Sequence, residues 1–393
     1  MMNFDVMPPR QGTRCDKWDG MSHTFGEAAA GDVIPLWVAD MDFACAPEIL
    51  SAVRSAYDCG ALGYRYLGDG FYAAIAGWMK KRHGLDVPTE WILPLPGVVS
   101  GISAAVAAFT DAGDGVIIQT PVYTPFHNVP RNMGRKLLEN PLVEKEENGI
   151  LRYEIDFEHL AALCADESAK VLVLCSPHNP VGRLYTPEEL ARIAQICAEN
   201  DVFLISDEIH SDIVLDGRKF TPILAAAPQR SRICQLGSPS KSFNTAGTHS
   251  AYMIIPDAEE RAKVQAFWHA LHIPTESFIS AEVITAAYNE AEYYVDELCP
   301  YVTENMHFLC SYLREHLPKV RLAQTEATYL LWADFSAYGT GKELMDTLVR
   351  EARVAPDPGD WFGSSYGGYL RINVAAPRSI IGEAAKRIVR CFG

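Results

Sequence analysis

Between residues 90 and 256, short apolar runs alternate with helical segments, and this alternation restricts the chain to few architectures. The runs are rich in Val, Ile and Leu and lack a polar residue at every second position, which is typical of strands covered on both faces. The expected strands are Val116–Thr120, Lys170–Cys175, Val202–Ser206, Ile233–Leu236 and Tyr252–Ile255. Such alternation predicts an α/β fold with a mostly parallel sheet, which binds ligands at the carboxyl ends of its strands.

The clearest helix signal follows Thr186, which precedes a proline at the first helical position. Glu189 stands where a capping box requires an acid, so we expect a helix that begins here and ends near Asn200.

The pattern changes after about residue 290. We expect helices over residues 291–317 and 342–352 and strands over 328–334 and 369–374. These elements predict a smaller α+β domain, and the first 45 residues have no evident partner in the large sheet. The expected division is therefore a large domain over residues 46–289 and a small domain formed by 1–45 and 290–393.

Composition excludes several classes of protein. The 393 residues carry a formal net charge of -16, which argues against a general nucleic-acid binder, since such proteins need a basic face. The ten cysteines show no zinc-ligand spacing, so we expect free thiols and no metal site. We see neither a signal peptide nor an apolar run of about 18 residues. A cytoplasmic protein without membrane spans is expected.

Lys241 follows one of the buried strands directly, in the sequence Ser238-Pro239-Ser240-Lys241. Desolvation lowers the pKa of such a lysine and favours the neutral amine that a Schiff base requires. Ser238 and Ser240 are placed to donate hydrogen bonds to a phosphate. Taken alone, this four-residue pattern is more typical of a lysine in a surface loop.

Three other strand ends carry polar or glycine-rich motifs. Asp207 can hold a proton on a pyridine nitrogen, or cap the next segment. Asn179 lies between prolines that stiffen its loop, although Asn-Pro is also ordinary in turns. Gly97 precedes a small-residue helix, and the amides of Val98 and Val99 can bind phosphate at its N-terminus. The alternative for this motif is a glycine turn before a core helix.

Together and in this order, the four motifs resemble those of fold-type I enzymes that depend on pyridoxal 5′-phosphate (PLP), the aspartate aminotransferase superfamily. The resemblance covers essentially the whole chain. It implies a seven-stranded, mostly parallel sheet in the large domain and PLP as cofactor. It also implies a role for each matching residue. Around the ring, Lys241 forms the Schiff base, Asp207 pairs with the pyridinium, Tyr123 stacks on the ring, Asn179 reaches the phenolic oxygen and His210 lies near the cofactor. The phosphate is held by Ser238, Ser240 and the amides of Val98 and Val99, and the substrate α-carboxylate is bound by Arg371 with Asn179.

Finer features are similar to those of the cystathionine β-lyase group named for the maltose-regulon modulator. They are the segments 36–43, 63–66, 207–210, 240–244 and 371–378. Ala39, within the first of these, is an expected substrate-binding residue. Residues 245–252 contain no arginine where many aminotransferases carry a phosphate-binding one, which favours the lyase branch. The branch implies a homodimer with shared active sites, in which Tyr64 contacts the cofactor of the partner subunit.

The predicted activity is elimination from cystathionine or a related cysteine S-conjugate, giving a thiol, pyruvate and ammonia. An aminotransferase on the same scaffold is one alternative. The other is a PLP-bearing regulatory protein that binds a transcription factor. Which sulfur amino acid is preferred stays open. Asp40, Tyr64, Tyr123 and Trp332 are candidates for the pocket lining, although Tyr329 and Trp332 fit the core of the small domain equally well.

Overall fold

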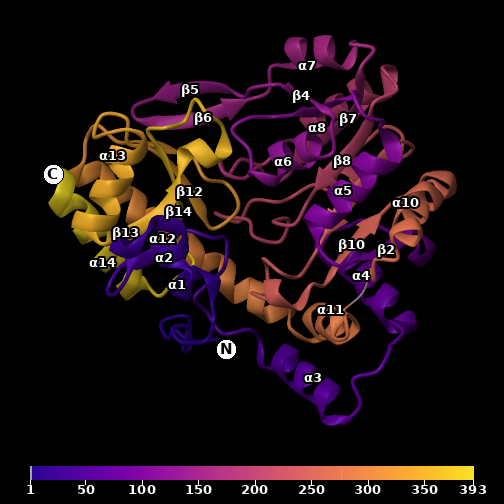
Figure 1. Cartoon of the computed structure of the whole chain (residues 1–393), viewed down its shortest axis with the longest axis horizontal. Helices are drawn as coiled ribbons and strands as arrows, with labels where there is room; N and C mark the ends of the chain where they lie inside the picture. The colour runs from indigo at the N-terminus through magenta and orange to yellow at the C-terminus, as the bar shows by residue number, and fades with distance from the viewer. Residues whose placement is uncertain (1, 276) are drawn as a thin grey trace.

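Two seven-stranded sheets organise the residues that the computed structural model describes, 2–275 and 277–393 (Figure 1). The first sheet has the order β2 (Ile92–Leu95), β10 (Ala251–Ile254), β9 (Ile233–Gly237), β8 (Phe203–Asp207), β7 (Ala169–Cys175), β3 (Gly115–Ile118) and β4 (Lys136–Glu139). Strand β10 is antiparallel to both of its neighbours, whereas the other pairs are parallel. The mostly parallel sheet is thus confirmed, and each expected strand is found within one or two residues of its expected ends.

Helices cover both faces of this sheet, which explains the continuous apolar strands. Along β7, Val171 and Val173 pack in one cluster with α5 (Val98–Phe109), α6 (Pro125–Asn132) and α10 (Ala258–Leu271). Leu172 and Leu174 face the opposite side, where α7 (Phe157–Cys164) and α8 (Pro187–Glu199) pack. The predicted capping box of α8 is confirmed: Thr186 Oγ1 accepts the Glu189 N–H, and the Glu189 carboxylate accepts the Thr186 N–H.

The second sheet gathers strands from distant parts of the chain. Its order is β1 (Ile34–Leu36), β13 (Val354–Pro358), β14 (Tyr369–Asn373), β12 (Leu330–Asp334), β11 (Arg321–Ala323), β6 (Ile150–Glu154) and β5 (Val143–Glu147). Helices α12 (Glu292–His316) and α14 (Arg378–Phe392) pack with it, and the expected helix over 342–352 divides into α13 (Gly341–Asp346) and a π-helical turn, Thr347–Ala352.

The hairpin β5–β6 runs beside the C-terminal strands rather than the first sheet (Figure 1). Residues 143–154, which the predicted division assigns to the large domain, pair through β6 with β11. The domain boundaries themselves stay a prediction.

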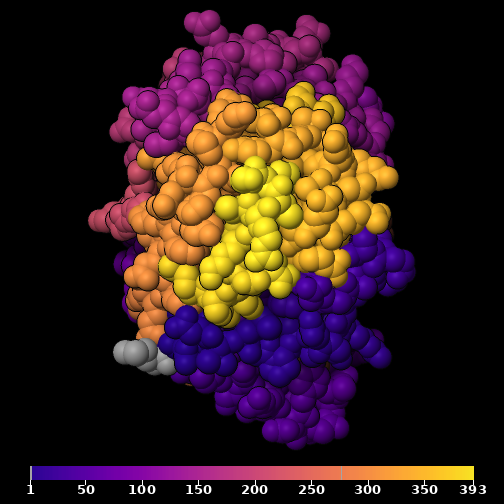
Figure 2. All heavy atoms as spheres, turned by 90° about the vertical axis from the view of Figure 1, so that its left-hand side faces the viewer, coloured from indigo at the N-terminus to yellow at the C-terminus, as the bar shows by residue number. Residues whose placement is uncertain are grey.

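The N-terminal segment lies beside the C-terminal helix, as Figure 2 shows by the contact of indigo and yellow atoms. Strand β1 is parallel to β13, and the Arg387 guanidinium on α14 donates to the Asp32 carbonyl oxygen at 2.9 Å. The two ends of the chain therefore complete the second sheet together.

The remaining helices connect these layers: α1 (Asp16–Asp19), α2 (Met21–Phe25), α3 (Pro47–Asp58), α4 (Gly68–His83), α9 (Ile223–Ala226) and α11 (Ser280–Glu290). All ten cysteines lie among the described residues and are free thiols. Over the same residues, every helix is too short or too polar to span a bilayer.

Candidate active site

A cavity of about 400 Å³ lies where the carboxyl ends of β7, β8 and β9 approach the second sheet. The first sheet places a different loop at each strand end, and β13 and β14 supply the facing wall. Eleven of the expected site residues line this cavity: Ala39, Val98, Val99, Tyr123, Asn179, Asp207, His210, Ser238, Ser240, Lys241 and Arg371.

Lys241 presents a buried amine to the cavity. Its Nζ donates to the Ala39 carbonyl oxygen at 2.6 Å. Burial lowers the pKa of Lys241 to about 8, and the positive charge of Arg371 acts in the same direction. A substantial fraction of this amine is therefore neutral near physiological pH, as a nucleophile or a base requires.

Asp207 ends β8 on the same side of the cavity. Burial raises the pKa of this carboxyl to about 6, although the Ile209 N–H, which Oδ1 accepts at 3.1 Å, acts against the rise. A cation placed against it would restore the carboxylate, so Asp207 suits a protonated ring nitrogen.

His210 is buried nearby, and burial lowers its pKa well below the usual value, with Lys241 and Arg371 adding to the effect. Its Nδ1 finds no hydrogen-bond partner within the described part of the chain. His210 therefore presents an uncharged imidazole with unused hydrogen-bonding capacity to the cavity.

Arg371 is held rigidly on β14. Its Nε donates to Asp357 Oδ2 at 2.7 Å, and Nη2 contacts the same oxygen. Its Nη1 donates to Asn179 Oδ1 at 3.1 Å, which joins the loop after β7 to the second sheet. Sequence reasoning missed Asp357, although an acid inside the apolar strand 354–358 was a signal, and Asp357 stands opposite Arg371 in the strand register.

The helix α5 points its first turn at the cavity. Gly97 is its N-cap, so the N–H groups of Val98 and Val99 have no partner within the helix. Ser238 lies beside them, but its hydroxyl donates to the Ser250 carbonyl at 2.7 Å and accepts the Ser240 N–H at 3.0 Å. The expected phosphate contact of Ser238 therefore requires its hydroxyl to turn away from Ser250.

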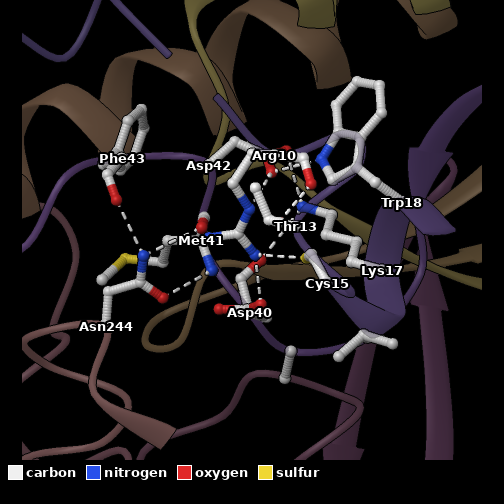
Figure 3. Close-up of polar contacts among 12 residues, drawn as sticks. Arg10, Thr13, Cys15, Lys17, Trp18, Asp40, Met41, Asp42, Phe43 and Asn244 are labelled. Carbon is white, nitrogen blue, oxygen red and sulfur yellow. Dashed lines mark hydrogen bonds and ion pairs between the residues drawn. The ribbon is translucent and has the colours of Figure 1, made fainter. Parts of the chain in front are cut away.

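The irregular segment 38–43 lines the cavity with Val38 and Ala39, and Figure 3 shows the polar side chains around the segment. The Lys17 ammonium donates to Asp42 Oδ2 at 2.8 Å with both side chains fully buried. Arg10 pairs with Asp40, and the Asn244 amide reaches the Met41 and Phe43 backbone. These contacts tie the first twenty residues to the turn that carries Lys241.

Some expected lining residues lie elsewhere. Trp332 is fully buried in the core, where its indole N–H donates to the Tyr153 hydroxyl at 3.1 Å, and Asp40 points to Arg10 instead of the cavity. The prediction that Asp40 lines the pocket is wrong, and for Trp332 the alternative of a core position is confirmed. Tyr64 is fully exposed between α3 and α4 and does not line this cavity. Other residues that sequence reasoning did not select also line it, Trp37, His249 and Trp361 among them.

Comparisons with known proteins identify the family to which this chain belongs. The family described as aminotransferase class I and II matches residues 32–388. Cystathionine beta-lyase PatB of Bacillus subtilis is 39% identical over 98% of this chain and 99% of its own. The crystal structure of cystalysin from Treponema denticola, which contains a pyridoxal 5′-phosphate cofactor, has a TM-score of 0.94 and 34% identity and covers 100% of this chain and 98% of its own.

The PLP-bound C-S lyase from Staphylococcus hominis has a TM-score of 0.90 and 32% identity, covering 99% of this chain and 98% of its own. These similarities extend over the strands, the cavity and both ends of the chain. The resemblance to fold-type I enzymes is thus confirmed, and the chain belongs to the aminotransferase class I and II family.

Proposed function

We propose that this protein is a PLP-dependent carbon–sulfur β-lyase, which converts cystathionine or a related cysteine S-conjugate and water to a thiol, pyruvate and ammonia. The observation that carries the proposal is the buried Lys241 amine, which shares one cavity with Asp207, Asn179 and Arg371. The full-length similarity to proteins named cystathionine beta-lyase and C-S lyase supports the lyase reaction over transamination.

The residues present fit PLP. The α5 N-terminus offers unpaired N–H groups to a phosphate, and Asp207, whose pKa burial raises, gains by facing a cationic ring nitrogen. The His210 Nδ1 has hydrogen-bonding capacity to spare. Val98, Val99, Ser238 and Ser240 would hold the phosphate, and Tyr123, Asn179, Asp207 and His210 the ring.

When bound, PLP supplies an electron sink that stabilises negative charge on the α-carbon of an amino acid. Arg371 binds the substrate carboxylate through its planar fork, and Asn179 fixes the direction of that fork. Lys241, once its amine is free, removes the α-proton as a general base. Asp207 keeps a proton on the ring nitrogen, and the walls of the cavity hold the carbon–sulfur bond in position for the thiolate to leave.

The protein acts as a homodimer in this proposal. Tyr64 stands on an exposed connection together with Leu62 and Tyr66, and exposed apolar clusters are typical of interfaces. A second copy of the chain covers this connection and receives Tyr64 at its own cavity.

The proposal is tested with purified protein, PLP and L-cystathionine, with pyruvate followed through lactate dehydrogenase. We expect a visible absorbance band of lysine-bound PLP and steady pyruvate release, both abolished by Lys241→Ala. The control is Lys342→Ala, because that side chain is 89% exposed and lies on α13, outside the cavity lining. A band without pyruvate would favour an aminotransferase or a regulatory protein, and pyruvate release unaffected by Lys241→Ala would refute the assignment.

A further inference from the structure

The segment 38–43 is largely buried yet has no regular secondary structure, so most of its carbonyl groups are satisfied by side chains. Asn373 donates to the carbonyl oxygens of Val38 and Asp40 at 2.8 and 2.9 Å. Tyr329 donates to that of Ala39 at 3.0 Å, where Lys241 also donates. The carbonyls of Met41 and Phe43 are left to a single side chain, Asn244.

Asn244 is three residues from Lys241 in the same turn. Its Oδ1 accepts the Met41 N–H at 3.1 Å, and its Nδ2 donates to the carbonyls of Met41 and Phe43 at 2.9 and 2.8 Å (Figure 3). The turn closes around it, because the Thr245 N–H donates to the Ser240 carbonyl at 3.0 Å. Asn244 has a φ of 58°, a left-handed conformation that asparagine tolerates better than most residues.

By holding residues 41–43 against the turn of Lys241, Asn244 fixes the distance between the Lys241 amine and the Ala39 carbonyl oxygen. A neutral amine has two N–H groups and one lone pair, so an N–H donated to the Ala39 carbonyl restricts where the lone pair points. Proton transfer depends steeply on such orientation. Neither Ala39 nor Lys241 can hold this arrangement alone, since one lies in a loop and the other on a flexible stem.

We propose that Asn244 is a positioning residue that clasps residues 41–43 to the turn of Lys241 and thereby holds the Ala39 carbonyl against the lysine amine. The claim rests on the proposed function only in assigning Lys241 as the base.

Two variants separate the clasp from the backbone conformation. Asn244→Gly keeps the left-handed turn without strain but removes all three hydrogen bonds. Asn244→Asp keeps the acceptor for Met41 and loses both donors. The matched control is Asn305→Asp, because buried Asn305 on α12 likewise donates to two backbone carbonyls, those of Val374 and Ala376, at 3.0 and 2.8 Å.

The first measurement is exchange of the α-proton of L-alanine with deuterated water, which reports proton abstraction without any leaving group. In both Asn244 variants we expect the saturated exchange rate to fall about tenfold or more, with little change in the half-saturating alanine concentration. The second measurement is the rate at which cofactor-free protein gains the absorbance band after PLP is added, which we expect to fall in the same variants.

Asn305→Asp should lower the melting temperature but leave both rates near those of the unmodified protein. Tyr329→Phe, which removes the hydroxyl that shares the Ala39 carbonyl with the Lys241 amine, should lower exchange in the same direction and keeps the test decisive if an Asn244 variant fails to fold. Folded Asn244 variants with unchanged rates, or an equal loss in Asn305→Asp, would overturn the proposal. Failure of cystathionine cleavage alone would refute the lyase and leave the clasp standing.

Discussion

The two central ionisable residues have pKa values displaced toward neutrality from opposite sides. Burial lowers that of Lys241 to about 8 and raises that of Asp207 to about 6. In both cases the folded chain disfavours the charged form, so each side chain destabilises the cofactor-free fold in the pH range where it is ionised. The site is thus built for a ligand that carries compensating charge.

Asp207→Asn should stabilise the cofactor-free protein at pH 8. Folding raises the pKa of this acid from 3.8 to about 6, so the protein loses about 3 kcal/mol of stability as the pH rises through that window. A neutral amide avoids the loss. Urea unfolding at pH 8 and pH 5 measures this, and we expect the gain at pH 5 to be about half as large. Equal stability of the two proteins at pH 8 would contradict this prediction. The variant should also bind PLP more weakly.

Arg371→Lys should raise the KM for an S-conjugate about 100-fold and change kcat less, because an ammonium cannot form the fork between Asp357 and Asn179. The control is Arg321→Lys on β11, which alters a similar contact with Asp334 of β12, away from the cavity. Steady-state kinetics of pyruvate release decides it, and a KM raised less than threefold would speak against a carboxylate-binding role.

Residues that follow buried strands could be identified from the sequence, and residues that act through distant partners could not. Lys241, Asp207 and Asn179 lie directly after or at the end of apolar runs, so the sheet brings them together at one edge. Asn244 owes its role to Met41, which is 203 residues away, and no local pattern pairs positions so far apart in the chain. Asp357 lies only 14 residues before Arg371, but its role depends on the pairing of β13 with β14.

At the scale of elements, apolar strands and capping motifs were predictable, and polar edge strands were not. The box at Thr186 and Glu189 is a local signal and is found as expected. Strands β4 and β5 carry Lys and Glu at exposed positions, so neither shows an apolar run. The hairpin β5–β6 was missed for a further reason: its partner β11 lies more than 160 residues away in the chain.

The loop after β7 depends on Gly182, which has a φ of 72°. A Cβ there would lie 2.6 Å from Thr325 Cγ2 and 3.2 Å from the Ala327 carbonyl oxygen. Gly182→Ala should therefore cost about 2 kcal/mol or more of stability and raise KM by displacing Asn179. Gly217→Ala is the control, because its φ is 65° with nothing within 4 Å of the added carbon, and it should cost about 1 kcal/mol. Equal melting temperatures for the two variants would count against the steric argument.

At the scale of the whole molecule, the cavity draws its walls from both sheets. Lys241 and Asp207 follow strands of the first sheet, whereas Arg371 and Asp357 lie in strands of the second. If residues 46–289 form one domain and the two ends of the chain form another, the site lies at the junction of the two domains. In the proposed homodimer, Tyr64 would add a residue from the partner subunit.

Sharing of residues between subunits predicts complementation. Tyr64→Ala and Lys241→Ala homodimers should both lack normal activity, whereas a mixed dimer has one site with its own Lys241 and an intact Tyr64 from the partner chain. Refolding the two in equal amounts should restore about a quarter of the unmodified activity, since half of the dimers are mixed and each has one complete site. Pyruvate release before and after mixing measures it, and the absence of recovery would exclude the shared site.

The closure of the second sheet by both ends of the chain has a consequence for synthesis on the ribosome. Within the described residues, β1 pairs only with β13, and Arg371 is synthesised after β13. The turn of Lys241 is complete more than a hundred residues earlier, but the carbonyl that meets its amine belongs to a segment that must wait for Asn373. We therefore expect the contact between the Lys241 amine and the Ala39 carbonyl to form only after β14 has been synthesised, so the positioned amine is a late product of translation.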